Sequence, residues 1–137
     1  MIMPSKITIE DIAVCGVNCL ACNAYLNKNN PCLGCTAPKE KHTRKSCRNC
    51  MKKECAYEQG LRWCFECERF PCSKLKSLDK RYKQNHGVDL LQNGMNAKQN
   101  MNVFLQEQKE RFTCKSCGGV IDQHRKKCSE CGLFITD

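Results

Sequence analysis

The spacing of apolar residues predicts two helices in the second half of the chain. In residues 72–84, Leu75, Leu78 and Tyr82 recur at i, i+3 and i+7, which places them on one face of a helix. Residues 96–112 repeat a similar pattern, and Asn96 is positioned to cap the start of that helix. The apolar face of this second helix consists of Met101, Phe104, Leu105 and Phe112.

Weaker patterns predict three further elements. Residues 19–29 are expected to form a helix that turns Leu20, Tyr25 and Leu26 inward. In residues 5–14, Ile7 and Ile9 alternate with polar residues, which favours a short strand. Residues 85–94 contain two glycines and are expected to form a turn with a short element.

The composition indicates that burial of apolar residues alone does not stabilise this fold. Hydrophobic residues make up 41% of the 137 residues, but that figure includes 15 cysteines and falls to about 30% without them. So small an apolar fraction is poor material for an unaided core in a chain of this length. Disulfides or bound metal ions are therefore required.

The N-terminal residues favour metal ions over disulfides. The stretch "MIMPSKITIEDIAV" lacks the basic and long apolar regions of a signal peptide, and no apolar run approaches the roughly 20 residues that span a bilayer. We therefore expect a cytoplasmic protein with no membrane span, whose thiols stay reduced. The odd number of cysteines also disfavours a closed disulfide set. A four-thiolate metal site contributes on the order of 10 kcal/mol to folding, enough to replace a missing core.

The positive charge is partly balanced if the cysteines bind metal. The formal net charge is +9, and residues 39–83 alone contain 14 basic and 6 acidic residues. A divalent ion with four thiolates carries a net charge of −2, because the ligand thiols lose their protons on binding. The lysine excess is thus weaker support for nucleic-acid binding than the formal charge implies.

The last four cysteines predict a zinc ribbon. Their spacing is C-x2-C-x10-C-x2-C, and each pair is followed by a glycine, Gly118 or Gly132, which permits a tight turn near a metal. The predicted zinc ligands are Cys114, Cys117, Cys128 and Cys131. The residues "VID" and "LFIT" are expected to form strands, and His124 is at most a spare ligand. Such a zinc ion is structural, with no open position for chemistry.

The stretch "CGVNCLAC" has the C-x3-C-x2-C spacing of cysteines that bind three irons of a [4Fe–4S] cluster. Cys72, in "RFPC", is the expected fourth ligand, so the predicted cofactor-binding residues are Cys15, Cys19, Cys22 and Cys72. The alternative is that these cysteines are divided among zinc sites. A radical S-adenosylmethionine enzyme is rejected, because Ala21 stands where an aromatic residue is usual and the chain is too short for the barrel.

A second four-thiolate site is expected to begin with Cys32 and Cys35. Its best-spaced partners are Cys64 and Cys67, followed by Cys50 and Cys55. Three cysteines remain over, for a further site with His42 or for a reactive pair. A thiol that binds no metal among Cys47, Cys50 and Cys55 lies beside basic residues, which makes it a candidate redox switch.

Residues 12–80 resemble a cysteine-rich family of unknown function found mostly in anaerobic bacteria and archaea. The resemblance rests on "CGVNCLACNAYL", "CLGC" and "CMKKECAYEQGLRWCFECERFPCSKL", in that order. It implies metal binding without an established reaction. Cys47 is an addition to the pattern, and the predicted ribbon is an extension that many members lack.

We therefore expect a small metal-stabilised α+β fold in three parts. They are a cysteine-rich metal-binding domain over residues 1–84, a helical connector over 85–111 and a zinc ribbon over 112–137. The three histidines, with no recognised catalytic motif, predict that the protein is not an enzyme.

Two functions compete on this basis. The first is a non-catalytic, metal-binding accessory or regulatory protein that docks on a partner enzyme or complex. It would respond to oxygen or redox state through iron–sulfur or thiolate chemistry. An oxygen-sensitive complex such as a corrinoid methyltransferase would suit it. The alternative is an RNA-, DNA- or ribosome-binding zinc protein that uses the basic residues 39–83. Aromatic residues for stacking on bases are few, which favours the first hypothesis.

Overall fold

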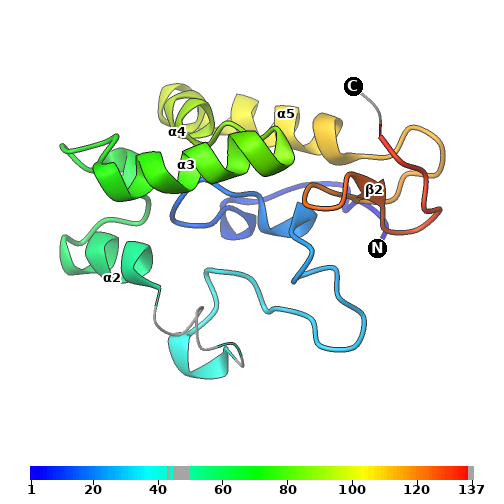
Figure 1. The fold of residues 1–137 in the computed structure, drawn as a ribbon, viewed down its shortest axis with the longest axis horizontal. Coiled ribbons are helices and arrows are strands. Elements are labelled where there is room, and N and C mark those ends of the chain that lie inside the picture. Colours follow the sequence, from blue (N-terminus) through cyan, green and yellow to red (C-terminus); the bar gives the residue numbers. More distant parts are fainter. Residues whose placement is uncertain (43, 45–49, 136–137) are drawn as a thin grey trace.

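A computed structural model describes residues 1–42, 44 and 50–135. This part of the chain is a small α+β fold with four α-helices and one two-stranded sheet. The helices are α2 (Met51–Glu58), α3 (Ser73–His86), α4 (Leu90–Gln99) and α5 (Met101–Phe112). Figure 1 shows α3, α4 and α5 gathered along one side of the N-terminal segment, with α2 and β2 at opposite ends.

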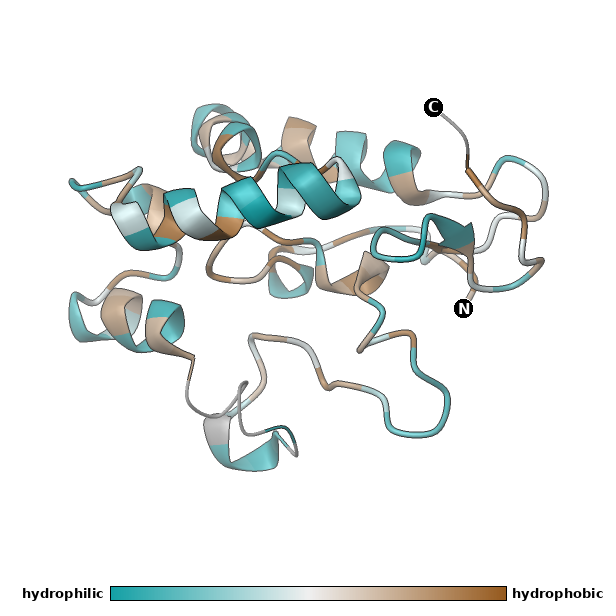
Figure 2. Cartoon of the chain, in the orientation of Figure 1, coloured by the Kyte–Doolittle hydropathy of each residue, from teal (hydrophilic) through white to brown (hydrophobic). Residues whose placement is uncertain are grey.

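The helix predicted over residues 72–84 is confirmed as α3. Leu75 is buried, and Leu78 and Tyr82 are half-buried, so the apolar face packs inward while polar residues cover the outer face (Figure 2). The helix ends at Gly87, whose φ of 65° is left-handed and whose amide donates to the Lys83 carbonyl. The buried Asp79 carboxylate accepts from the Leu90 amide at 2.7 Å, which fixes the start of α4 against α3.

The boundary between the last two helices differs from the prediction. Residues 90–99 form the helix α4 and not a turn, so Asn96 lies inside that helix. Asn100 caps α5 instead, because its side chain accepts a hydrogen bond from the Val103 amide at 3.2 Å. Gly94 does not break α4, and the ring of Phe70 and the Cβ of Phe65 pack against it from outside the helix.

Two of the N-terminal predictions are wrong. The expected helix over residues 19–29 is only a 3-10 turn, η2 (Cys19–Ala21), in which the Asn18 side chain accepts from the Leu20 amide. The expected strand near Ile7 is absent from the described chain, and the 3-10 turn η1 (Ile9–Asp11) follows it. Ile7 is nevertheless buried. Short turns replace regular elements here because the Asp11 and Asn18 side chains accept hydrogen bonds from nearby backbone amides.

Of the two strands expected near the last cysteines, the first is present in shortened form, whereas the described residues 133–135 of the second are not a strand and β1 pairs with residues 127–128 instead. The strands β1 (Ile121–Asp122) and β2 (Lys127–Cys128) pair antiparallel, with Ile121 opposite Cys128. Phe134, in the stretch expected to form a strand, makes an isolated bridge with Lys127. The hairpin brings the two C-x-x-C pairs together.

One hydrophobic cluster includes residues from all three predicted parts of the chain. It contains Ile12 and Leu20 from the N-terminal part, Phe104 from α5, and Val120 and Cys128 from the hairpin. Backbone hydrogen bonds reinforce the junction, for example from the Gln123 amide to the Ala21 carbonyl at 2.9 Å. None of the helices in the described residues is long and apolar enough to cross a membrane.

Candidate metal centres

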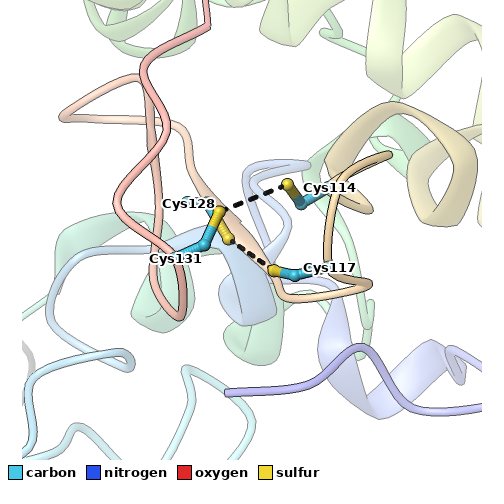
Figure 3. Close-up of side chains that lie close together, drawn as sticks. All are labelled: Cys114, Cys117, Cys128 and Cys131. Atoms are coloured by element: carbon cyan, nitrogen blue, oxygen red, sulfur yellow. Dashed lines mark hydrogen bonds between the residues drawn. The ribbon is translucent and has the colours of Figure 1, made fainter.

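The four C-terminal cysteines converge on one point. Their sulfur atoms all lie within 4.8 Å of one another, although the residues come from both sides of the β1–β2 hairpin (Figure 3). The Sγ atoms of Cys114 and Cys131 are 3.8 Å apart, and those of Cys117 and Cys128 are 3.5 Å apart. Cys114 and Cys128 are buried, whereas Cys117 and Cys131 are exposed. The site therefore lies at the surface, with two of its four cysteines buried beneath it.

This arrangement fits one tetrahedral metal ion. Four sulfurs at the Zn–S distance of about 2.3 Å stand about 3.8 Å apart. Two of the six separations, 3.5 and 3.8 Å, match that spacing, and the other four do not exceed 4.8 Å. Four thiolates suit zinc by both ligand type and geometry. The described cysteines are free thiols, so no disulfide competes with a metal among them.

Backbone amides and glycines support the sulfur positions. The Gly119 amide donates to Cys117 Sγ and the Glu130 amide donates to Cys128 Sγ, each at 3.4 Å. Gly118 and Gly132 adopt φ values of 78° and 75°, as expected for the residue after each pair. Gly119 is a supporting residue that sequence reasoning missed: a Cβ there would lie 2.8 Å from Cys128 Sγ. The adjacent "GG" was the available signal.

The thiols of this site differ in acidity. Burial raises the pKa of Cys128, but amide hydrogen bonds from Cys131 and Glu130, helped by neighbouring thiols, lower it to about 7. At Cys117, the Gly119 amide lowers the pKa, but burial and hydrogen bonds with the other three sulfurs raise it to about 11. Cys128 thus loses its proton readily, whereas the loss of a second proton, from Cys117, is unfavourable. A divalent cation supplies the charge that allows all four to ionise.

His124 lies away from the C-terminal sulfurs. Its Nδ1 accepts from the Asn23 amide and its Nε2 is 3.2 Å from the Tyr82 hydroxyl. Both ring nitrogens are therefore engaged, and the histidine joins the hairpin to α3. Burial, followed by the charge of His86, lowers its pKa, while Asp122 opposes the shift.

A second concentration of thiols lies in the N-terminal half. The Cys35 amide donates to Cys19 Sγ at 3.5 Å, so these two cysteines are in contact. The hydrogen bond with Cys19 lowers the pKa of Cys35 to about 7, against the effect of burial and with help from Lys53. Burial raises the pKa of Cys15 to about 12, with further contributions from Cys35, Cys64 and Cys50. Cys15, Cys19 and Cys35 thus form the centre of this group.

The remaining members of this group lie at its edge. Burial raises the pKa of Cys22, and the charges of Cys35 and Cys32 add to the effect. His42, which the sequence suggested for a further site with the remaining cysteines, is buried, with Nε2 3.3 Å from Lys53 Nζ. The same Lys53 Nζ donates to the Cys35 carbonyl at 3.0 Å. Burial and the Lys53 charge both lower the pKa of His42, which keeps it neutral.

Cys72 lies beside other cysteines of residues 55–67. It lines a small cavity together with Cys55, Cys64 and Cys67, whereas the sequence pattern placed it with Cys15, Cys19 and Cys22. Burial raises the pKa of Cys64 to about 11, and the charges of Cys72, Cys55, Cys50 and Cys67 contribute. Cys35 contacts Cys19, and the expected pairing of Cys32 and Cys35 with Cys64 and Cys67 stays a prediction. Cys47 is outside the described residues.

The N-terminal thiols lie in a segment that matches a family model. Residues 11–77 match the family model described as Protein of unknown function (DUF3795). The match supports a cysteine-rich domain of unknown function in this segment, close to the bounds of the resemblance over residues 12–80. No curated protein and no solved structure matches the chain.

The DUF3795 segment contains eleven of the 15 cysteines and ends before α4. Both N-terminal thiol groups therefore lie inside it, while the four C-terminal sulfurs lie outside it. Yet the two parts are in contact, because Ala21 and Asn18 of the DUF3795 segment accept hydrogen bonds from the Gln123 backbone and side chain. The C-terminal hairpin thus packs directly on the turn that carries Cys19 and Cys22.

Proposed function

We propose that the protein is a non-catalytic, metal-binding accessory protein that holds zinc with its four C-terminal cysteines and docks on a protein partner. The convergence of four sulfurs within 4.8 Å carries this proposal. A zinc ion at such a site stabilises the fold and presents the surrounding surface. It leaves no open coordination position for a substrate.

The surroundings of two of the three histidines support an absence of turnover. His124 has both ring nitrogens engaged, and His42 is buried beside the cationic Lys53. A general acid or base needs a nitrogen within reach of a substrate proton.

Exposed apolar side chains near the four cysteines support docking on a protein. Leu133 and Phe134 directly follow the second C-x-x-C pair, and Ile2 bridges to Gly119 within the first knuckle. Their exposed fractions are 52%, 66% and 59%, large for side chains of this size. A metal ion that orders the knuckles would hold this surface in one shape.

The N-terminal thiols support a redox-responsive role, with either zinc or a [4Fe–4S] cluster bound there. Two thiolates lose two electrons to an oxidant such as peroxide and form a disulfide, and the metal ion that they held is released. Loss of the ion would reorder the segment and weaken docking. An oxygen-sensitive enzyme complex is the kind of partner for which such a response is useful.

Metal analysis of the full chain purified without oxygen tests the metal assignment. We expect zinc in the protein, lowered by one equivalent in Cys114→Ser. Iron and a brown colour would indicate a cluster in the N-terminal half. A Cys114→Ser protein with an unchanged metal content would refute the C-terminal site.

A capture experiment tests docking. Immobilised wild-type protein and a Leu133→Ser/Phe134→Ser variant are compared, each with and without air. A protein captured by the wild type, released by air and lost with the variant supports the proposal. Capture of RNA that is indifferent to air and falls steeply with salt would support the nucleic-acid alternative instead.

A further inference from the structure

Four cysteines from three consecutive elements line one small, partly open cavity. Cys55 lies on α2, Cys64 begins the 3-10 turn η4 (Cys64–Glu66), Cys67 follows that turn, and Cys72 caps α3. Together they line a cavity of about 30 Å³ whose remaining walls are Ala56, Gln59, Phe70 and Leu75. These four cysteines thus line a single space, although their sulfurs, unlike those of the C-terminal four, are not all gathered within 4.8 Å of one another.

The cavity has the size and lining of a metal site. A single water molecule needs roughly 10–15 Å³, so a volume of about 30 Å³ accommodates one ion with little excess space. Apart from Gln59, the walls are sulfur and apolar carbon. Cys64, Cys67 and Cys72 are half-buried and Cys55 is exposed, so a cation would offset the partial desolvation cost of their thiolates.

The backbone around Cys67 repeats the geometry of the C-terminal site. The Arg69 amide donates to Cys67 Sγ at 3.4 Å, as the Gly119 and Glu130 amides do to Cys117 and Cys128. In each case the donor is the residue two positions after the cysteine. Amide hydrogen bonds of this kind favour the thiolate that binds a metal.

Gln59 connects two of the sulfurs. Its Nε2 donates to Cys55 Sγ at 3.5 Å, and its Oε1 accepts from the Cys67 thiol at 3.6 Å. The sulfurs of α2 and of the following turn are therefore held together by one side chain. Cys72 completes the set from the N-terminus of α3, where the positive end of the helix dipole favours an anionic ligand.

We propose that Cys55, Cys64, Cys67 and Cys72 bind one divalent metal ion, and that this ion is zinc. Four sulfur ligands around a space for a single ion are the donor set that zinc prefers. The ligand spacing is then C-x8-C-x2-C-x4-C, a set that divides the DUF3795 cysteines differently from the sequence pattern. The ion would fasten α2 and the segment after it to the start of α3.

Metal stoichiometry of paired variants tests this site. The full chain is stripped of metal under reducing conditions and reloaded with Co²⁺, whose thiolate absorption reports tetrahedral sulfur ligation. If the four cysteines share one ion, Cys55→Ser, Cys72→Ser and the double variant each lose the same single equivalent. Cys55→Ser/Cys114→Ser should lose two. Unchanged cobalt binding in either single variant, or a loss of two equivalents in Cys55→Ser/Cys72→Ser, would overturn the proposal.

A ligand exchange covers the case in which serine variants do not fold. Cys72→His retains a metal ligand, so we expect the bound cobalt to remain and its visible bands to shift as nitrogen replaces sulfur. A full cobalt complement with an unshifted spectrum would show that Cys72 is not a ligand. Iron bound in a Cys72-dependent manner in the protein as purified would refute the zinc assignment. The Cys114→Ser single variant reports on the C-terminal site alone, so failure of either site is recognised separately.

Discussion

Phe70 packs against the backbone of α4 at Gly94. A Cβ added to Gly94 would lie 2.9 Å from Cζ of Phe70 and 3.2 Å from Cβ of Phe65. Phe70 also lines the cavity formed by Cys55, Cys64, Cys67 and Cys72. The contact therefore connects the helical part of the fold to the segment that carries these thiols.

Gly94→Ala is expected to destabilise the protein by about 1–3 kcal/mol, because the added methyl group overpacks this contact. The gain of about 1 kcal/mol in helix propensity should not compensate fully. Phe70→Leu removes the nearest ring atoms, so the double variant should be more stable than the sum of the single effects. Urea unfolding in zinc-containing buffer measures all three, and a stabilised Gly94→Ala protein would contradict the packing argument.

Cys114→Ser is expected to remove the C-terminal ion and lower the free energy of unfolding by several kcal/mol, since structural zinc binding contributes on the order of 10 kcal/mol. Cys114 is buried in the core cluster, so the lost ion also loosens the packing of the hairpin. Ser116→Ala is the matched control, because Ser116 is exposed between the two cysteines of the same knuckle. Thermal unfolding with and without a chelator should separate the two variants clearly.

Gly119→Ala is expected to weaken metal binding without removing a ligand. The new Cβ would meet Cys128 Sγ at 2.8 Å and Glu130 Cβ at 2.9 Å, so the second knuckle must move away from the first. Overpacking of this kind costs about 1–3 kcal/mol, or roughly one to two orders of magnitude in affinity. Competition for zinc with a chromogenic chelator measures the change, and an affinity equal to that of Ser116→Ala would be inconsistent with the close approach.

Asn100→Ala is expected to cost about 1 kcal/mol, within the usual range of about 0.5–2, because the Val103 amide loses its cap. Asn96→Ala should change stability by less than about 0.5 kcal/mol, since Asn96 lies within α4 and its bond with Gln92 is exposed. Urea unfolding of the two variants compares them directly. The reverse order of effects would restore the helix start predicted from the sequence.

The stability of the protein should fall more steeply with acid when His124 is present. Burial, followed by the His86 charge, lowers its pKa in the folded state, whereas the unfolded value is about 6.5. Below about pH 6.5 the unfolded chain therefore binds more protons than the folded protein, and stability falls as the pH falls. His124→Gln removes this proton uptake, so its free energy of unfolding should fall less than that of the wild type between about pH 7 and 5.5. If the free energies of unfolding of the two proteins fall in parallel, His124 does not contribute to the pH dependence of stability.

The sequence allowed prediction of the features that depend on short-range spacing. The period of Leu75, Leu78 and Tyr82 predicted α3, and the paired cysteines predicted the convergence of Cys114, Cys117, Cys128 and Cys131. Both depend on residues that one helix or one hairpin brings together. Such local geometry is nearly independent of the rest of the fold.

Predictions failed where contacts from distant segments decided the outcome. Gly94 looked like a turn residue, but Phe65 and Phe70 pack on it and residues 90–99 remain helical. The stretch after Cys19 looked helical, but buried Asn18 holds a short turn there by accepting from Leu20 and donating to Gln108. In both places, side chains distant in sequence outweigh modest local propensities.

The division of the N-terminal thiols shows the same limit. By itself, the sequence determined that this chain has too few apolar residues for an unaided core, and its 15 cysteines predicted metal binding. Only the tertiary structure placed Cys72 with Cys55, Cys64 and Cys67, and Cys35 with Cys19. The N-terminal cysteine pairs have similar spacings, so spacing along the chain does not show which pairs share a site. The choice depends on how α2, the turns and α3 pack against one another.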